Sequence, residues 1–188
     1  MIAKSTGRTI LIAVALGVVG ACGPVARPDG GKGLLAVGAI APDVVGTTPE
    51  GKKASLWPTR GHAAVVYFYP KDETPGCTKE ACAFRDAFAR YEAQNVTIFA
   101  VSRDSEESHR TFRAKHALPF PLVADEDGSI ARAYGVSSTL GMTSRVTFLV
   151  GADGRVVRVW PEVDPGVHAT EVLTAAGASQ AKTVGLEP

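Results

Sequence analysis

The feature that most constrains the fold is a nearly unbroken apolar run, Ala63 to Tyr69, rich in β-branched and aromatic residues. Such a run is typical of a strand buried on both faces of a sheet. A second run of this kind covers residues 96–101, and between the two lies a stretch from Cys77 to about Ala93. Apolar residues recur there every three or four positions, which marks one buried face of a helix. Buried strands that alternate with helices predict an α/β fold.

The rest of the chain continues this alternation. A loop ending in Asp-Gly between two apolar runs predicts a hairpin. The expected elements are a small leading hairpin over 51–56, a helix over 106–116 with Phe112 as its inward anchor, a strand over 122–124, a helix over 130–134, hairpin strands over 146–150 and 156–160, and a last helix over 168–176. Together they predict a mixed central sheet flanked by helices.

Composition limits both the number of domains and the kinds of partner. The 188 residues, 45% of them hydrophobic, suit one globular domain. The formal charge of +1 and the absence of long Lys/Arg runs argue against a nucleic-acid partner. Only Cys22, Cys77 and Cys82 occur, too few for a fold held together by disulfides, so each cysteine needs its own explanation.

The first segment has the layout of an export signal. Two positive charges precede an apolar run over 10–19, which is shorter than the roughly 20 residues of a spanning helix. The run ends in Val-Gly-Ala before Cys22, which resembles a bacterial lipoprotein signal in which that cysteine carries the lipid. An ordinary signal peptide cut near Ala21 and an uncleaved anchor are the alternatives.

This interpretation divides the chain into a signal over 1–21, a flexible tether over 22–37, rich in Gly, Pro and Ala, and a domain over 38–180. It predicts an extracytoplasmic protein held to a bacterial membrane by a lipid on Cys22. In a Gram-negative cell the domain would face the periplasm.

The residues around Cys77 carry the chemistry. Cys77 follows a loop at the expected start of a helix, where free N–H groups and the helix dipole favour a thiolate and lower the pKa of the thiol. Thr74 supplies a hydroxyl three residues earlier. Pro70 and Pro75 stiffen the loop, and Gly76 permits a close backbone approach. These residues predict a nucleophile that attacks peroxide oxygen.

Cys82 lies five residues after Cys77 on the same predicted helix. On an intact helix this spacing gives about 500° of rotation and places the Cα atoms roughly 8–9 Å apart, beyond the limit of about 7 Å for a disulfide. A bridge between the two would therefore require the helix to unwind. Such a bridge suits a catalytic cycle that starts from a sulfenic acid. Two buried core cysteines, or a permanent bridge, are the alternatives.

The motif Pro70-x-x-x-Thr74-x-x-Cys77 resembles the active-site motif of the peroxiredoxins, and residues 67–86 resemble their bacterioferritin comigratory protein or Q-type subgroup. The resemblance continues to about residue 177, through the segments 38–43, 101–104, 120–122, 145–149 and 160–173. It implies a thioredoxin-like fold and the reduction of hydrogen peroxide and organic hydroperoxides, with no cofactor or metal.

The resemblance also assigns roles to six residues. Cys77 is the implied peroxidatic cysteine and Cys82 the resolving one. Thr74 and Arg145 are implied to bind and polarise the peroxide, Pro70 to shield the site from water, and Glu80 to orient Arg145. A permanently charged guanidinium beside a thiolate also makes electrostatic sense. One molecule can complete this cycle, so we expect a monomer. Outside the cytoplasm the reductant is expected to be a membrane-linked thioredoxin-like protein.

Other functions are less well supported by the residues. A thioredoxin-like thiol–disulfide oxidoreductase or electron carrier normally has two residues between its cysteines, and four intervene here. A copper chaperone on the same fold would need a shorter cysteine spacing and a matching histidine. The four histidines share no ligand spacing and are interpreted as surface or packing residues. Asp72 and Glu73 are interpreted as solvated charges.

Overall fold

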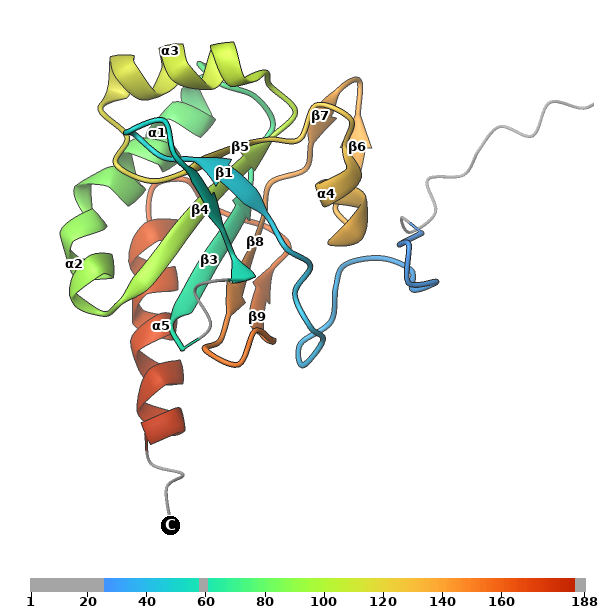
Figure 1. Cartoon of the computed structure of the whole chain (residues 1–188), viewed down its shortest axis with the longest axis vertical. Helices are drawn as coiled ribbons and strands as arrows, with labels where there is room; N and C mark the ends of the chain where they lie inside the picture. Colours follow the sequence, from blue (N-terminus) through green and yellow to red (C-terminus); the bar gives the residue numbers. More distant parts are fainter. Residues whose placement is uncertain (1–25, 58–60, 185–188) are drawn as a thin grey trace, which may run out of the picture.

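A computed structural model describes residues 26–57 and 61–184 (Figure 1). The strands in this part of the chain are β1 (Val45–Thr47), β2 (Lys53–Ser55), β3 (Ala63–Phe68), β4 (Val96–Ser102), β5 (Leu122–Ala124), β6 (Ser138–Thr139), β7 (Met142–Thr143), β8 (Val146–Val150) and β9 (Val156–Trp160). Seven of them form one sheet in the order β2-β1-β5-β4-β3-β8-β9, and β6 pairs with β7 in a separate ribbon.

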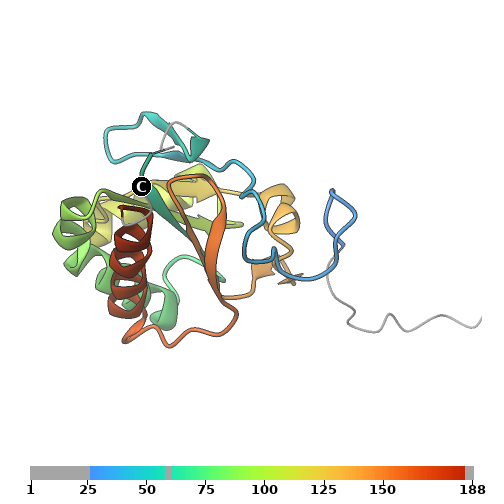
Figure 2. The same ribbon diagram turned by 90° about the horizontal axis from the view of Figure 1, so that it is seen from below.

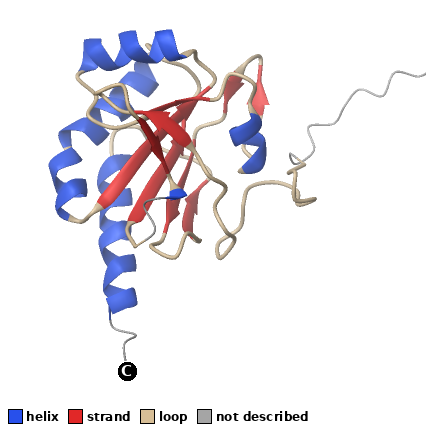
Figure 3. Ribbon diagram, viewed as in Figure 1, coloured by secondary structure: helices blue, strands red, loops and turns tan. Residues whose placement is uncertain are grey.

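The helices surround this sheet, as Figure 3 shows. They are α1 (Pro75–Asp86), α2 (Phe88–Ala93), α3 (Glu106–His116), α4 (Ser129–Ala133) and α5 (His168–Val184). The strand order explains where they lie. β3, β4 and β5 are parallel neighbours that advance in one direction across the sheet. Because crossovers between parallel strands are right-handed, the helices of both connections, α1 with α2 and then α3, fall on the same face.

The sheet has a hydrophobic core on each face. Tyr67, Ile98 and Leu149 belong to a cluster that includes side chains from α1, α2, α3 and α5. Val66 and Phe148 belong to a second cluster on the opposite face, which α4 and the N-terminal segment cover. Figure 2 shows α5 and α4 on opposite sides of the sheet. Every residue of β3 is buried, so the prediction of a strand covered on both faces is confirmed.

Two predicted helix boundaries were wrong. The helix expected from Cys77 to Ala93 is broken at Ala87, where φ is −91° and ψ is −2°. Periodicity could not reveal this break, because Phe84 and Tyr91 on its two sides still face the same core. The last helix continues to Val184 rather than ending at residue 176, and Figure 1 shows α5 running past the edge of the sheet.

The predicted N-terminal signal and Cys22 lie outside the described residues, but part of the predicted tether does not. Leu35 is only 4% exposed, and its backbone N–H donates to the Tyr134 carbonyl at 2.9 Å. The Arg27 guanidinium donates to the Gly33 and Leu34 carbonyls. Packing against the domain therefore begins at least three residues before the predicted boundary at residue 38. Among the helices of the described part, none has the length and apolar character needed to cross a bilayer.

Candidate active site

Cys77 lies in the first turn of α1, directly behind the loop that leaves β3. Pro75 occupies the first helical position, where its missing N–H removes no helical hydrogen bond. The Thr74 carbonyl accepts from the Thr78 N–H at 2.9 Å, which closes the first turn. The N–H groups of a first turn have no acceptor inside the helix, so they surround Cys77 with partial positive charge. The Cys77 side chain is buried, with 2% exposure.

Arg145 reaches this cysteine from the loop between β7 and β8. Its Nη2 donates to Cys77 Sγ at 3.2 Å, although the two residues are 68 positions apart in the chain. A Cβ added to Gly76 would lie 3.4 Å from Arg145 Nη2, so the guanidinium lies close to the backbone of the first helical turn. Burial alone would lower the pKa of Arg145, but Glu80 and Cys77 outweigh it and raise that pKa. The guanidinium therefore carries a fixed positive charge beside the sulfur.

Glu80 holds the other edge of the same guanidinium. Its Oε2 accepts from Arg145 Nη1, and the carboxyl group is fully buried. Burial raises the pKa of Glu80 to about 7, against the opposing attraction of Arg145. Its second oxygen, Oε1, has no hydrogen-bond partner among the described residues. The structure thus brings together three of the predicted site residues, Cys77, Arg145 and Glu80, around one charged group.

The remaining predicted residues lie nearby in the chain with looser contacts. The Thr74 hydroxyl donates to the Lys71 carbonyl at 3.0 Å, which leaves its oxygen able to accept a hydrogen bond. Pro70 is half-buried at the start of the loop. Cys82 is half-buried further along α1, and its thiol and that of Cys77 are both free. Because α1 is continuous from Pro75 to Asp86, the two sulfurs are held on an intact helix.

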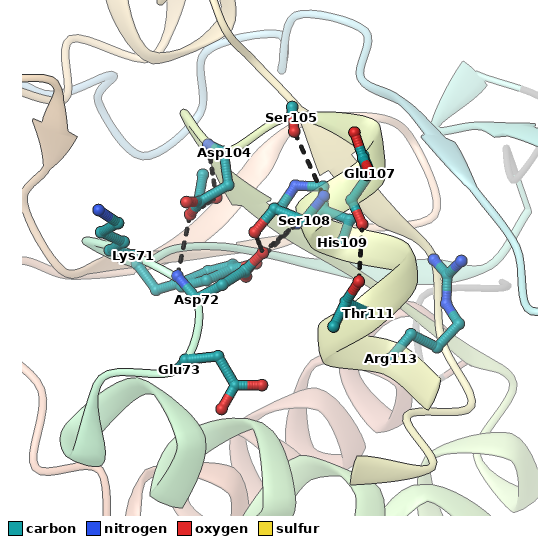
Figure 4. Close-up of polar contacts among 12 residues, drawn as sticks. Lys71, Asp72, Glu73, Asp104, Ser105, Glu107, Ser108, His109, Thr111 and Arg113 are labelled. Atoms are coloured by element: carbon teal, nitrogen blue, oxygen red, sulfur yellow. Dashed lines mark hydrogen bonds and ion pairs between the residues drawn. The ribbon is translucent and has the colours of Figure 1, made fainter. Parts of the chain in front are cut away.

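A buried polar network that the sequence did not predict is centred on Asp72, in the loop before α1. Asp72 was predicted to be a solvated charge, which was wrong, because it is 5% exposed and contacts three side chains. Those side chains are Tyr69, Ser108 and His109. Figure 4 shows Ser108 and His109 directed toward Asp72. One signal was available: His109 lies three residues before the inward anchor Phe112, so both share the buried face of α3.

The described residues contain no group of three or more His, Cys, Asp or Glu side chains placed to hold a metal ion.

Comparisons with known proteins agree with this geometry. The AhpC/TSA family model matches residues 37–159. The chain is 39% identical to a Bcp-type peroxiredoxin of Coxiella burnetii over 146 residues, which cover 74% of this chain and 97% of the relative. It is 37% identical to peroxiredoxin Bcp of Bacillus subtilis over 147 residues, covering 74% of this chain and 93% of that protein.

Among solved structures, peroxiredoxin Q of Xanthomonas campestris superposes with a TM-score of 0.66 at 37% identity. The match covers 72% of this chain and 90% of that one. It confirms the thioredoxin-like fold and favours a peroxidase over a thiol–disulfide carrier or a copper chaperone. The chain therefore belongs to the AhpC/TSA family as a peroxiredoxin of the bacterioferritin comigratory protein or Q type, and it is a thiol-dependent peroxidase.

Proposed function

We propose that Cys77 is the nucleophile of this peroxidase, the residue whose sulfur attacks the peroxide. The observation that carries the proposal is the 3.2 Å contact between Arg145 Nη2 and Cys77 Sγ at a buried helix start. A guanidinium and first-turn N–H groups both favour the thiolate over the thiol. The thiolate is the form that attacks an electrophilic oxygen, so the charge around Cys77 suits the first step of peroxide reduction.

In that step Sγ attacks one oxygen of the hydroperoxide, and an S–O bond forms as the O–O bond breaks. The second oxygen departs as an alkoxide or hydroxide and takes a proton from water, giving an alcohol or water. Cys77 is left as a sulfenic acid, oxidised by two electrons. Arg145 lies where it can stabilise the negative charge that develops on the departing oxygen.

The neighbouring residues take supporting roles in this scheme. The Thr74 oxygen accepts the hydrogen bond of the incoming hydroperoxide, since its own proton is donated to Lys71. Glu80 fixes the orientation of Arg145 through the second guanidinium nitrogen. Pro70 covers the loop side of the site with a ring that offers no N–H group to water.

Cys82 then resolves the sulfenic acid. Its sulfur attacks Sγ of Cys77, a disulfide forms, and the sulfenic oxygen leaves as water with the thiol proton. Because the bridge cannot span an intact helix, the first turns of α1 have to unwind for this step. A thioredoxin-like reductant with two thiols returns the two electrons and allows α1 to reform.

Two single substitutions and one mass measurement test the assignment. The Cys77→Ser protein should lose hydroperoxide consumption, while Cys82→Ser should consume about one equivalent and stop. In the unsubstituted protein, one equivalent of peroxide should remove two hydrogens from a peptide that contains both cysteines. Normal turnover by the Cys77→Ser protein would remove this assignment.

The location of the protein is a separate proposal. The lipoprotein-like sequence before Cys22 favours a chain anchored to a bacterial membrane and exposed outside the cytoplasm. The packing of Leu35 against the domain leaves a short linker between that cysteine and the folded part. Intact-mass analysis of membrane-extracted protein should find a lipid-bearing chain that begins at Cys22. A chain that keeps residues 1–21, or lacks the added mass, would contradict the anchor. The same sample should sediment as a monomer once in detergent.

A further inference from the structure

Asp72 is a buried carboxylate at the centre of a compact polar network. Its oxygens accept hydrogen bonds from the Tyr69 hydroxyl at 2.7 Å, the Ser108 hydroxyl at 2.7 Å and His109 Nδ1 at 3.0 Å. Its backbone N–H donates to Asp104 Oδ2 at 2.9 Å. Figure 4 shows the loop and α3 meeting at this carboxylate. Three contacts from distant parts of the chain and one from Tyr69, three residues earlier, thus hold a single loop residue.

The protonation of the network follows from its geometry. Burial alone would raise the pKa of Asp72, but the hydrogen bonds from His109, Ser108 and Tyr69 outweigh it and hold that pKa below its usual value. An ionised carboxylate only accepts hydrogen bonds, so Nδ1 of His109 carries a proton. Burial and the neighbouring Asp72 raise the pKa of Tyr69, which keeps its hydroxyl a donor. All three donors therefore match the acceptor they surround.

This network ties the start of the active-site loop to three elements. Ser108 and His109 lie on α3, and Asp104 follows β4. On the other side, the buried Thr143 hydroxyl of β7 donates to the Tyr69 carbonyl at 2.7 Å. Residues 69–72 are therefore held by α3, by the residues after β4 and by β7. Of these elements, β7 leads directly to Arg145.

The hold weakens immediately after Asp72. Glu73 has a left-handed backbone, with φ of 62°, and its carboxylate is 40% exposed beside Lys115 and His116 of α3. Thr74 begins α1 without capping it through its side chain. An exposed ion pair contributes little, and a non-glycine residue with positive φ is a natural point for the backbone to change direction. The network around Asp72 thus ends where the segment that has to unwind begins.

We propose that the Asp72–His109 pair is a positioning device that fixes the upstream end of the unwinding segment and favours the folded, peroxide-reactive form of α1. This inference rests on the proposed cycle of Cys77 and Cys82. Removing the anchor frees the loop and raises the unwound fraction. The rate of peroxide attack then falls, because only the folded fraction is competent, while disulfide formation, which uses the unwound form, does not slow.

The two steps can be measured separately by rapid mixing with limiting hydrogen peroxide and acid quenching, followed by mass analysis of the sulfenic and disulfide forms. His109→Leu should slow peroxide attack roughly threefold to tenfold, while the disulfide step stays equal or becomes faster. His109→Asn should restore most of the attack rate, because its amide N–H can replace Nδ1–H toward Asp72. Glu107→Gln, which removes an exposed charge from the same helix, is the matched control and should leave both rates unchanged.

Ser108→Ala guards against variants that fail to fold. It removes one of the three side-chain donors to Asp72. Peroxide attack should slow by less than in His109→Leu, while disulfide formation should again stay equal or become faster. Equal slowing of both steps, or unchanged rates in His109→Leu and Ser108→Ala, would overturn the proposal. Such a result leaves the proposed cycle intact, since that cycle fails only if the unsubstituted protein forms no sulfenic acid and disulfide on Cys77.

Discussion

Helices α1 and α3 are nearly equal in length, at 12 and 11 residues, but they begin in different ways. α3 is capped by Ser105, whose hydroxyl accepts from the Ser108 N–H at 3.3 Å, and it carries Glu106 and Glu107 in its first turn. α1 starts at Thr74 with no side-chain cap and no acidic residue in its first turn. The first helix leaves its positive end open, whereas the second neutralises it.

The open start of α1 suits the nucleophile proposed for Cys77. A carboxylate or a cap at the start of α1 would compete with the Cys77 sulfur for the same N–H groups and for the same dipole. Arg145 contacts both Cys77 and Glu80 of α1 from outside the helix. The proposed cycle requires the first turns of α1 to unwind, and it makes no such demand on α3.

The largest expected effect comes from removing the guanidinium of Arg145. Arg145→Ala should slow the reaction of Cys77 with hydrogen peroxide about 100-fold or more, because it removes the donor beside the reacting sulfur. Stopped-flow kinetics with hydrogen peroxide would measure this change. Arg155→Ala, at an exposed arginine in the β8–β9 hairpin, is the control and should behave like the unsubstituted protein.

A smaller effect should appear in the pH dependence of stability. The pKa of Glu80 is about 7 in the folded chain and near 4.5 when exposed, so the folded state holds more protons between these values. The protonated Glu80 carboxyl therefore stabilises the folded state at low pH, and this stabilisation is lost as the pH rises through that window. Relative to Glu80→Gln, the unsubstituted protein should lose on the order of 2–3 kcal/mol between pH 4.5 and pH 8.

Urea unfolding of both proteins at the two pH values would measure this difference. Glu92→Gln, at an exposed position in α2, supplies a control for removing a carboxylate. The unsubstituted and Glu80→Gln proteins should differ in their free energy of unfolding by different amounts at the two pH values. An equal difference at both would contradict a raised pKa for the buried carboxyl group.

The smallest effects compare the two helix starts directly. Ser105→Ala should lower the free energy of unfolding by about 1 kcal/mol, because it removes the cap of α3. Thr74→Ala should lower it by only a few tenths, since that side chain caps nothing and makes one partly exposed hydrogen bond. Chemical denaturation of both variants would measure the two losses in the free energy of unfolding. A larger loss from Thr74→Ala would mean that α1 depends on its own cap after all.

Much of this architecture could be predicted from local sequence. Burial of the run that ends at Tyr69 and the inward position of Phe112 depend on short-range patterns, and both predictions were confirmed. The place of Cys77 in a first helical turn was also evident, because the loop prolines and the onset of helical spacing are local signals. Local patterns failed at Ala87, where a break leaves the periodicity on both sides unchanged.

Local patterns were enough to predict the buried strands, most of the helical segments and the helix start at Cys77, because those properties depend on neighbours a few residues apart. The contact between Arg145 and Cys77 and the burial of Asp72 among Tyr69 and His109 depend on how the folded chain packs. Charge and solvent access at a point are set by every group packed around it. Most of those groups come from distant parts of the chain.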